Sequence, residues 1–204
     1  MKDNKLRLIM NMTASEVKAM VAGFYRYKKQ CPVVAFEASD WARFRAGEPA
    51  DVLAVTESRM LYEIEVKISL SDMKNDKKKR KHYHFMNTTD YIPVHQFYFA
   101  VPKELVSKAL EICKEYYPYA GLLSVSKFPF NSAAIDFGVH CEHRAKVISN
   151  ERLTIKQVMY LVIEQSGTLC RLARDRAIAE KAYKIEQIEN RKLNKALILA
   201  GVTA

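Results

Sequence analysis

The chain has 204 residues and a formal net charge of +10, from 33 Lys and Arg against 23 Asp and Glu. A hydrophobic fraction of 49%, with only six glycines and six prolines, excludes wholesale disorder and allows a sizeable core. The charge favours a polyanionic partner, either nucleic acid or an anionic membrane surface, or marks a basic protein without such a partner.

No apolar run approaches the roughly 20 residues that cross a bilayer, and no secretory signal is apparent. The cysteines are scattered and form no CxxC pair, which is typical of reduced thiols; they are Cys31, Cys113, Cys141 and Cys170. We therefore expect no membrane association and a cytoplasmic location.

Helices and strands alternate along residues 1–150, the predicted core. Thr13-Ala-Ser-Glu16 is a capping-box pattern that opens a helix predicted over 13–30, and a buried strand follows over 33–36. Further strands are predicted over 51–55, 61–70, 96–101 and 121–125, with additional short ones over 136–139 and 146–149. Helices are predicted over 71–86, capped by Ser71, and over 102–117, opened by Pro102. The order predicts an α/β fold with a mixed central sheet flanked by helices.

Residues 151–204 differ in character and are predicted as a C-terminal helical extension. A second capping-box pattern, Thr154 to Gln157, opens a segment of helical propensity that continues to Leu199, with an interruption expected near Ser166-Gly167. Its apolar positions are irregular for a coiled coil. Two interpretations stay open, namely a helix that forms a homodimer and a helix that packs back onto the core.

The segment Leu61 to Leu70 alternates apolar and polar residues with the period of a strand. The alternation puts the even-numbered residues into the core and lines Glu63, Glu65, Lys67 and Ser69 along the other face. A hairpin that turns over residues 56–60 would bring Asp51 beside Glu65 on that same face, if the register holds. The competing interpretation is an amphipathic edge strand with a solvated polar face.

Two converging carboxylates form a hard oxygen site of the kind that Mg²⁺ and Mn²⁺ prefer. Such an ion neutralises charge at a scissile phosphate and lowers the pKa of a bound water. A lysine two residues from the metal-binding glutamate can stabilise the negative transition state. The pattern of Asp51, Glu65 and Lys67 therefore indicates a metal-dependent nuclease.

Pro49-Ala50-Asp51 followed by Glu65-Val66-Lys67 resembles the PD-(D/E)XK nuclease superfamily, here with one residue between the proline and the aspartate. That resemblance implies a restriction-endonuclease-like fold with an αβββαβ core. It also implies Asp51 and Glu65 as metal ligands, the Val66 carbonyl as a third ligand, and Lys67 as the catalytic lysine. The segments at 65–72, 97–102 and 121–125 are similar to a bacterial and phage branch that includes the MmcB-type DNA-repair-associated proteins.

Other charged residues allow a functional and a structural interpretation. Glu63 either binds a second metal ion as part of the catalytic set or stands at the mouth of the site. Glu16 is either an extra acidic ligand or only the partner of Thr13 in the capping box. Glu37 poses the same question, and Asp72 is better explained by the dipole of the helix it begins.

The basic run that starts at Lys74 is predicted to contact nucleic acid near the site. The residues expected to contact it are Ser69, Lys74, Lys77 and Lys78. Tyr83 is expected to pack inward with Phe85. His140-Cys141-Glu142-His143 lacks a recognised zinc spacing, and Trp41 and Phe44 are expected to serve core packing rather than base stacking.

The function predicted is an Mg²⁺- or Mn²⁺-dependent deoxyribonuclease that hydrolyses DNA phosphodiester bonds in DNA repair, recombination or phage DNA processing. The alternative is a nucleic-acid-binding module of the same fold with little or no turnover. A third and weaker interpretation is a structural or regulatory partner that acts through the C-terminal helix.

Overall fold

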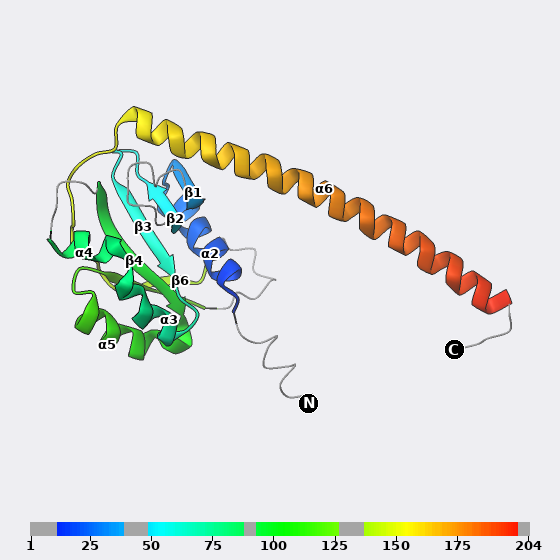
Figure 1. The fold of residues 1–204 in the computed structure, drawn as a ribbon, viewed down its shortest axis with the longest axis horizontal. Helices are drawn as coiled ribbons and strands as arrows, with labels where there is room; N and C mark the ends of the chain where they lie inside the picture. Colours follow the sequence, from blue (N-terminus) through cyan, green and yellow to red (C-terminus); the bar gives the residue numbers. More distant parts are fainter. Residues whose placement is uncertain (1–11, 39–48, 88–92, 127–136, 200–204) are drawn as a thin grey trace. The chain divides into compact units, whose positions relative to one another are not determined.

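A six-stranded mixed sheet organises the chain in the computed structural model, which describes residues 12–38, 49–87, 93–126 and 137–199 (Figure 1). The strands are β1 (Val33–Ala38), β2 (Ala50–Val55), β3 (Leu61–Val66), β4 (Val94–Pro102), β5 (Gly121–Val125) and β6 (Val139–His143). They lie in sequence order across the sheet. The pairs β1–β2, β2–β3 and β5–β6 are antiparallel, whereas β3–β4 and β4–β5 are parallel.

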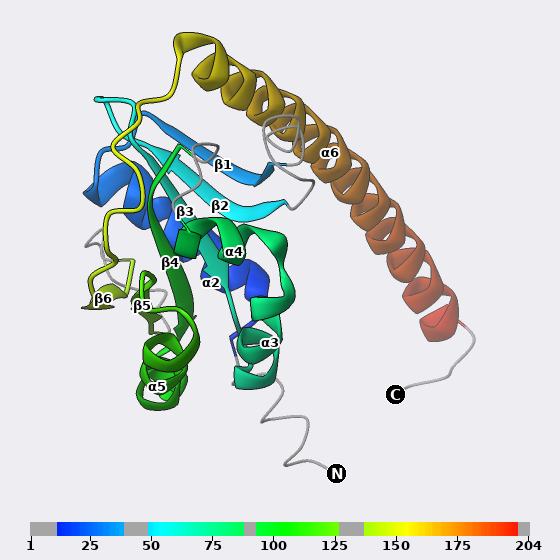
Figure 2. The same cartoon turned by 60° about the vertical axis from the view of Figure 1, so that its left-hand side comes forward.

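Helices of the first 150 residues cover both faces of this sheet. The helices of the chain are α2 (Ala14–Gly23), η1 (Phe24–Lys28), α3 (Leu70–Asn75), η3 (Asp76–Lys78), α4 (Arg80–Asn87), η4 (Lys103–Leu105), α5 (Val106–Tyr116) and α6 (Ile155–Leu199). Parallel neighbours need crossover connections, which α3 to α4 supply between β3 and β4, and α5 supplies between β4 and β5. Figure 2 shows α2 on one side of the strands and α3 and α4 on the other.

The alternation of side chains along the strands divides the core into two clusters. Leu53, Phe97 and Phe99 face the layer of α3, α4 and α5, and belong to one cluster. Val52, Ile64 and their neighbours face α2 and η1, and belong to the other. The α/β class, the mixed sheet between helices, and the order helix, three strands, helix, strand, helix, strand are thus confirmed.

Several predicted boundaries need correction. The first helix changes at Phe24 from α-helix to π-helix, and the strand predicted over 61–70 ends at Val66. The helix predicted over 71–86 is three short pieces, α3, η3 and α4, and its N-cap is Ser69, whose hydroxyl accepts the Asp72 N–H, rather than Ser71. Tyr83 is exposed instead of packing inward, because α4 buries the face that carries Lys81, His82 and Phe85.

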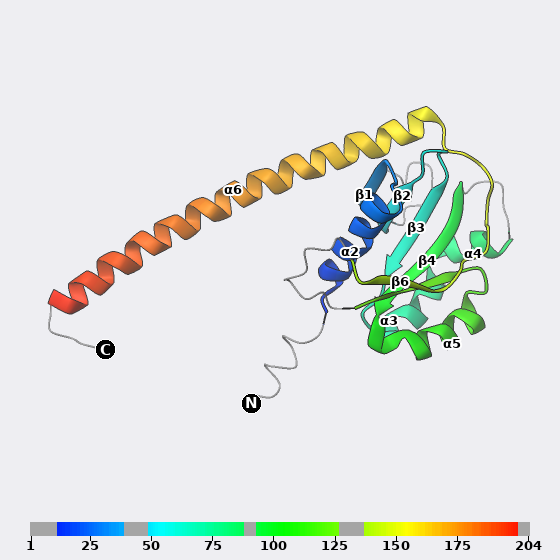
Figure 3. The same cartoon turned by 180° about the vertical axis from the view of Figure 1, so that it is seen from behind.

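The remaining corrections concern the C-terminal third. Residues 146–149 form no strand, and β6 lies earlier, over Val139–His143. The helix α6 continues through Ser166 and Gly167 without interruption, since one glycine costs a helix only about 1 kcal/mol (Figure 3). Asp136, Trp41 and Phe44 lie outside the described residues.

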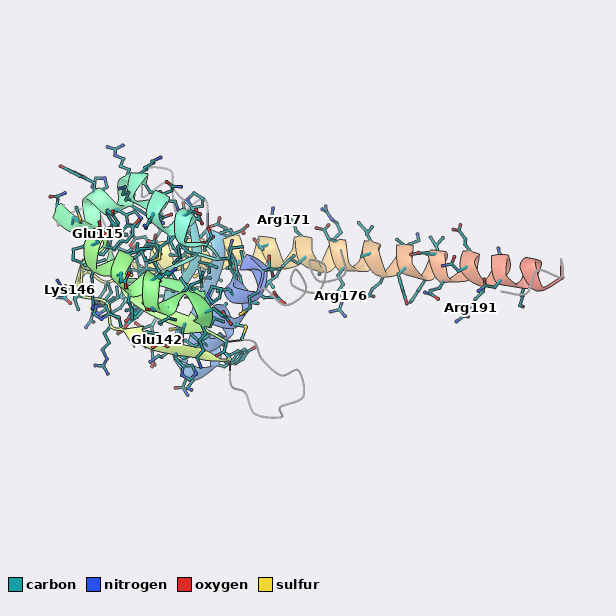
Figure 4. The ribbon with its side chains drawn as sticks, turned by 90° about the horizontal axis from the view of Figure 1, so that it is seen from below. Glu115, Glu142, Lys146, Arg171, Arg176 and Arg191 are labelled. Carbon is teal, nitrogen blue, oxygen red and sulfur yellow. The ribbon has the colours of Figure 1, made fainter. Side chains whose placement is uncertain are left out.

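Two compact units divide the chain, Met1–Glu164 and Gln165–Ala204. The first turns of α6 belong to the first unit because Val158 and Leu161 pack in its core. Beyond them, the side chains of Arg171, Arg176 and Arg191 extend outward from the helix (Figure 4). Leu169, Leu172 and Ile178 are also exposed, and a homodimer through this helix stays a prediction. Within the described residues, no helix combines the length and apolar character that crossing a bilayer requires.

Candidate functional site

The polar face of β3 is buried, which differs from the solvated face that an edge strand would present. Glu63 is 0% exposed and Glu65 is 2% exposed, because the segment from α3 to α4 covers this face. Lys67, just beyond the strand, is buried as well, and its N–H donates to the Ala100 carbonyl. Glu63 is therefore an interior residue, and its role in a catalytic set stays a prediction.

Three lysines neutralise the two glutamates. The Lys81 ammonium lies 3.1 Å from Glu63 Oε1 and also binds Glu65 Oε1. The Lys79 ammonium lies 2.9 Å from Glu65 Oε2, and that of Lys67 lies 3.5 Å from the same oxygen. Buried charges are tolerated only when they are paired, so these contacts are what permits two carboxylates in the core.

Asp76, the first residue of η3, is the centre of this network. Its Oδ1 lies 2.5 Å from Lys67 Nζ and 2.8 Å from Lys79 Nζ, and its Oδ2 lies 2.7 Å from His82 Nε2. Burial alone would raise the pKa of Asp76, but the hydrogen bonds from His82, Lys67 and Lys79 outweigh it and hold the pKa well below its usual range. Asp76 is therefore an anion at neutral pH and holds the Lys67 ammonium near Glu65.

The same logic applies to the lysines. Burial would lower the pKa of Lys79, but Glu65 and Asp76 outweigh it and raise that pKa well above its ordinary value. The pKa of Lys81 is also raised, since Glu63 and Glu65 outweigh the cost of burial. Both lysines are therefore cations at neutral pH, and the network is held together by full charges.

His82 extends the network into the apolar core. Its Nδ1 lies 2.5 Å from the Tyr119 hydroxyl, and its ring packs against Phe97 and Tyr117. Because the Asp76 carboxylate only accepts, His82 Nε2 donates to it, which leaves Nδ1 for the hydrogen bond with the Tyr119 hydroxyl. Burial raises the pKa of Tyr119 well above its ordinary value, so that hydroxyl keeps its proton.

Asp51 lies at the start of β2, next to the end of β3. The pairs Val52 with Ile64 and Leu53 with Glu63 set a register that, continued by one residue, would place Asp51 opposite Glu65. The Asp51 Oδ2 accepts the Val66 N–H at 2.9 Å, and its Oδ1 lies 2.8 Å from the Lys18 ammonium of α2. The two halves of the predicted motif, 15 residues apart, thus meet through a hydrogen bond.

The acidic candidates on the α2 side have structural partners. Glu16 completes the capping box, in which its Oε2 accepts the Thr13 N–H at 2.7 Å. Glu37 lies 2.7 Å from the Lys18 ammonium. The helix α2 thus reaches Asp51 through Lys18, and Glu16 forms the capping box that was its structural interpretation.

The predicted nucleic-acid residues lie on the outside of the covering segment. Lys74, Lys77 and Lys78 are exposed, and the Lys77 ammonium lies 4.4 Å from the centre of the Tyr116 ring. The Ser69 hydroxyl caps α3. The basic run that starts at Lys74 therefore has two parts. Lys79 and Lys81 point inward and pair with the glutamates, whereas Lys74, Lys77 and Lys78 face solvent.

The donor set suits a hard cation by its chemistry, since Asp51, Glu65 and the Val66 carbonyl all offer oxygen. Its arrangement is less favourable, because Lys79 and Lys81 bind Glu65, and Lys18 binds Asp51. Among the residues that the structure describes, no three His, Cys, Asp or Glu side chains are grouped to hold a metal ion. A divalent ion at Glu65 would compete with the ammonium groups of Lys79 and Lys81, of which Lys79 is the more exposed, at 33%.

Sequence reasoning missed Asp76, Lys79, Lys81 and His82 as site residues. Asp76 and His82 sit in a polar run that has no periodicity, and Lys79 and Lys81 look like any other cations there. One signal was available in the sequence. If the strand face that carries Glu63 and Glu65 is buried, these carboxylates need cationic partners from another segment, and the closest cations in the sequence lie in this run.

Comparisons with known proteins add little to this geometry. No family model and no curated protein matches the sequence. Among solved structures, the chain is similar to the SPO1766 protein of unknown function from Silicibacter pomeroyi, with a TM-score of 0.46 and 16% identity over 76% of this chain and 86% of that one. We draw no conclusion from a similarity of this size.

Proposed function

We propose that the chain is a PD-(D/E)XK-type, metal-dependent deoxyribonuclease that hydrolyses DNA phosphodiester bonds, with a role in DNA repair, recombination or phage DNA processing. The observation that carries this proposal is the hydrogen bond from the Val66 N–H to the Asp51 carboxylate. It joins the aspartate of the predicted motif to the segment that holds Glu65 and Lys67. A helix, three antiparallel strands, a helical crossover and a parallel fourth strand also suit the αβββαβ core of that superfamily.

In this proposal Asp51, Glu65 and the Val66 carbonyl hold Mg²⁺ or Mn²⁺, which supplies Lewis-acid stabilisation and an activated water. Lys67 contributes a positive charge at the reacting phosphate, and Asp76 holds that ammonium 2.5 Å from its own Oδ1. Glu63 binds Lys81 and so keeps the charge of the buried network balanced. The exposed Lys74, Lys77 and Lys78 bind DNA phosphates next to the site.

One observation favours a second function, a nucleic-acid-binding module without turnover. Glu63, Glu65 and Asp51 each face an ammonium group of the chain itself. A protein that keeps this arrangement would compete poorly for a divalent ion and would use its exposed lysines alone.

A cleavage assay separates the two functions. Purified protein is incubated with single-stranded, duplex and branched DNA, and with RNA, in Mg²⁺, Mn²⁺ or EDTA. We expect cleavage that requires the metal and falls at least about 100-fold in Asp51→Asn, Glu65→Gln and Lys67→Met. Asp51 is partly exposed, so its variant should keep the fold, which a melting curve checks. The control is Asp175→Asn in α6, whose carboxylate is 61% exposed and pairs with Arg174, and which should leave cleavage unchanged.

Binding without cleavage in every condition would exclude the enzyme and support the module. In that case the salt dependence of binding identifies the surface. Replacing Lys74, Lys77 and Lys78 by Gln should lower the slope of log affinity against log salt by about one unit for each phosphate that is no longer neutralised. An unchanged slope would show that DNA binds elsewhere.

A further inference from the structure

A cavity of about 190 Å³ lies on the other face of the sheet, between the strands and η1. Phe24, Tyr25, Tyr62 and Tyr98 supply aromatic walls, and the polar groups of the cavity include Gln96 and Lys29. These residues belong to or adjoin the cluster under α2 and η1, so the cavity is separated by the sheet from Glu63 and Glu65. It has no part in the proposed nuclease chemistry.

One wall of the cavity is fixed by close packing. The Tyr98 ring lies over Gly121, where a Cβ atom would come within 2.3 Å of the ring carbon Cε1. The Tyr98 hydroxyl donates to Gln96 Oε1 at 3.2 Å, and Gln96 Nε2 donates to the Ala145 carbonyl at 3.1 Å. Both polar ends of this wall are therefore oriented before any ligand arrives, which lowers the entropic cost of binding.

The opposite wall comes from the π-helix η1. Phe24 and Tyr25 are its first two residues, and the Lys29 N–H donates to the Phe24 carbonyl at 2.9 Å, five residues back. Single π turns are rare and often occur at functional sites. Gln30 has φ 55°, a left-handed conformation that ends the helix there. The Lys29 ammonium lies 5.5 Å from the centre of the Phe24 ring and thus sits against the aromatic wall.

A second hollow, of about 480 Å³, adjoins the cavity and shares Lys29 and Thr56 with it. Ser58 and Glu57 of the β2–β3 turn also line this hollow, and the Thr56 and Ser58 hydroxyls lie 2.9 Å apart. An ammonium and two hydroxyls suit an anionic group, while the Glu57 carboxylate opposes it. An anion is therefore expected on the Lys29 side.

We propose that this cavity binds a small planar aromatic ligand that carries one anionic group, the chemistry of a nucleoside monophosphate. The ring lies among Tyr25, Tyr62 and Tyr98, Gln96 hydrogen-bonds its edge, and the anion extends to Lys29. The size agrees with this assignment. Pockets for drug-sized ligands measure about 300–1,000 Å³, so 190 Å³ admits one ring system and leaves the anionic group outside, in the adjoining hollow.

The thiol of Cys141 can report on ligand binding in this cavity. Cys141 lines the cavity yet is exposed, whereas Cys170 is exposed on α6, and Cys31 and Cys113 are buried. The alkylation rates of Cys141 and Cys170 by iodoacetamide are measured in the full chain by peptide mass analysis. The probes are AMP, GMP, CMP and UMP, the four corresponding nucleosides, and inorganic phosphate alone.

We expect at least one monophosphate to slow alkylation of Cys141 several-fold while Cys170 reacts as before. Lys29→Gln, at an exposed position, should weaken that protection about tenfold, and Asp51→Asn, at a partly exposed position that does not line the cavity, should leave it unchanged. The Asp51 variant separates this proposal from the nuclease proposal, since either can fail alone. Three results would overturn it: no protection by any probe up to about 10 mM, equal protection by phosphate alone, or equal protection by the nucleosides together with no effect of Lys29→Gln.

Discussion

The two faces of the central sheet bury different kinds of side chain. Under α3, η3 and α4, the sheet buries Glu63 and Glu65 and compensates them with three lysines. Under α2 and η1, it buries apolar and aromatic side chains around a small cavity. Adjacent residues of one strand, Glu63 and Ile64, thus belong to two different kinds of interior.

The difference matters for stability and for function. A paired charge in the core contributes little net stability, but removing one partner leaves the other buried and unpaired, which is costly. An apolar face loses stability only in proportion to the packing it loses. A protein that keeps a buried charge network gains specificity of position rather than stability, and such positioning is what a reactive site needs.

The largest effect is expected at Asp76. Asp76→Ala removes the partner of Lys67, Lys79 and His82 and should lower the free energy of unfolding by about 3–5 kcal/mol. The matched control is Asp72→Ala, which also removes an ion pair with Lys67, at 3.5 Å, but from an exposed carboxylate, and should cost about 0–1 kcal/mol. Urea unfolding measures both. Equal losses of stability would mean that the network is no tighter than a surface ion pair.

The pH dependence of the free energy of unfolding is a second test of the charge network around Asp76. The pKa of Asp76 is lower in the folded chain than in the unfolded one, so its stabilisation is present above the unfolded pKa of about 3.9 and is lost as pH falls below it. Asp76→Asn, compared with wild type by urea unfolding from about pH 6 downwards, should show a flatter acid limb. The raised pKa of Lys79 has the reverse sign, since its contribution is lost above a pH of about 10.4. An identical acid limb in the variant would place the acid-sensitive groups outside this network.

A smaller effect is expected on the aromatic face. Gly121→Ala would push a methyl group into the Tyr98 ring and to within 2.7 Å of the Ala145 nitrogen, at a cost of about 1–3 kcal/mol. Gly167→Ala in α6 is the control, because its Cβ would meet nothing within 4 Å and should stabilise the helix by about 0.5–1 kcal/mol. Thermal melting measures both variants. A neutral Gly121→Ala would mean that Tyr98 moves freely and that the cavity wall is not fixed.

Local patterns in the sequence were sufficient for much of the fold. The capping box at Thr13, the period-two alternation after Leu61 and the apolar run after Gln96 each act over a few residues. Each predicted the right kind of element, although the helix changes at Phe24 and the strand after Leu61 ends at Val66. The boundaries that failed, at Ser71 and Ser166-Gly167, lay where several weak local preferences compete. At Ser71 the competing cap at Ser69 forms instead, and at Gly167 a cost of about 1 kcal/mol is too small to interrupt a long helix.

By itself, the sequence determined which residues of β3 share a face, because the alternation of side chains along a strand is a property of the backbone. It also brought Asp51 within one hairpin of Glu65. Only the tertiary structure decided what covers that face, that Lys79 and Lys81 turn inward from a basic run, and that Asp76 and His82 join them. These contacts connect residues whose separation along the chain carries no period, so they depend on how helices pack onto the sheet and on the need to neutralise buried charge.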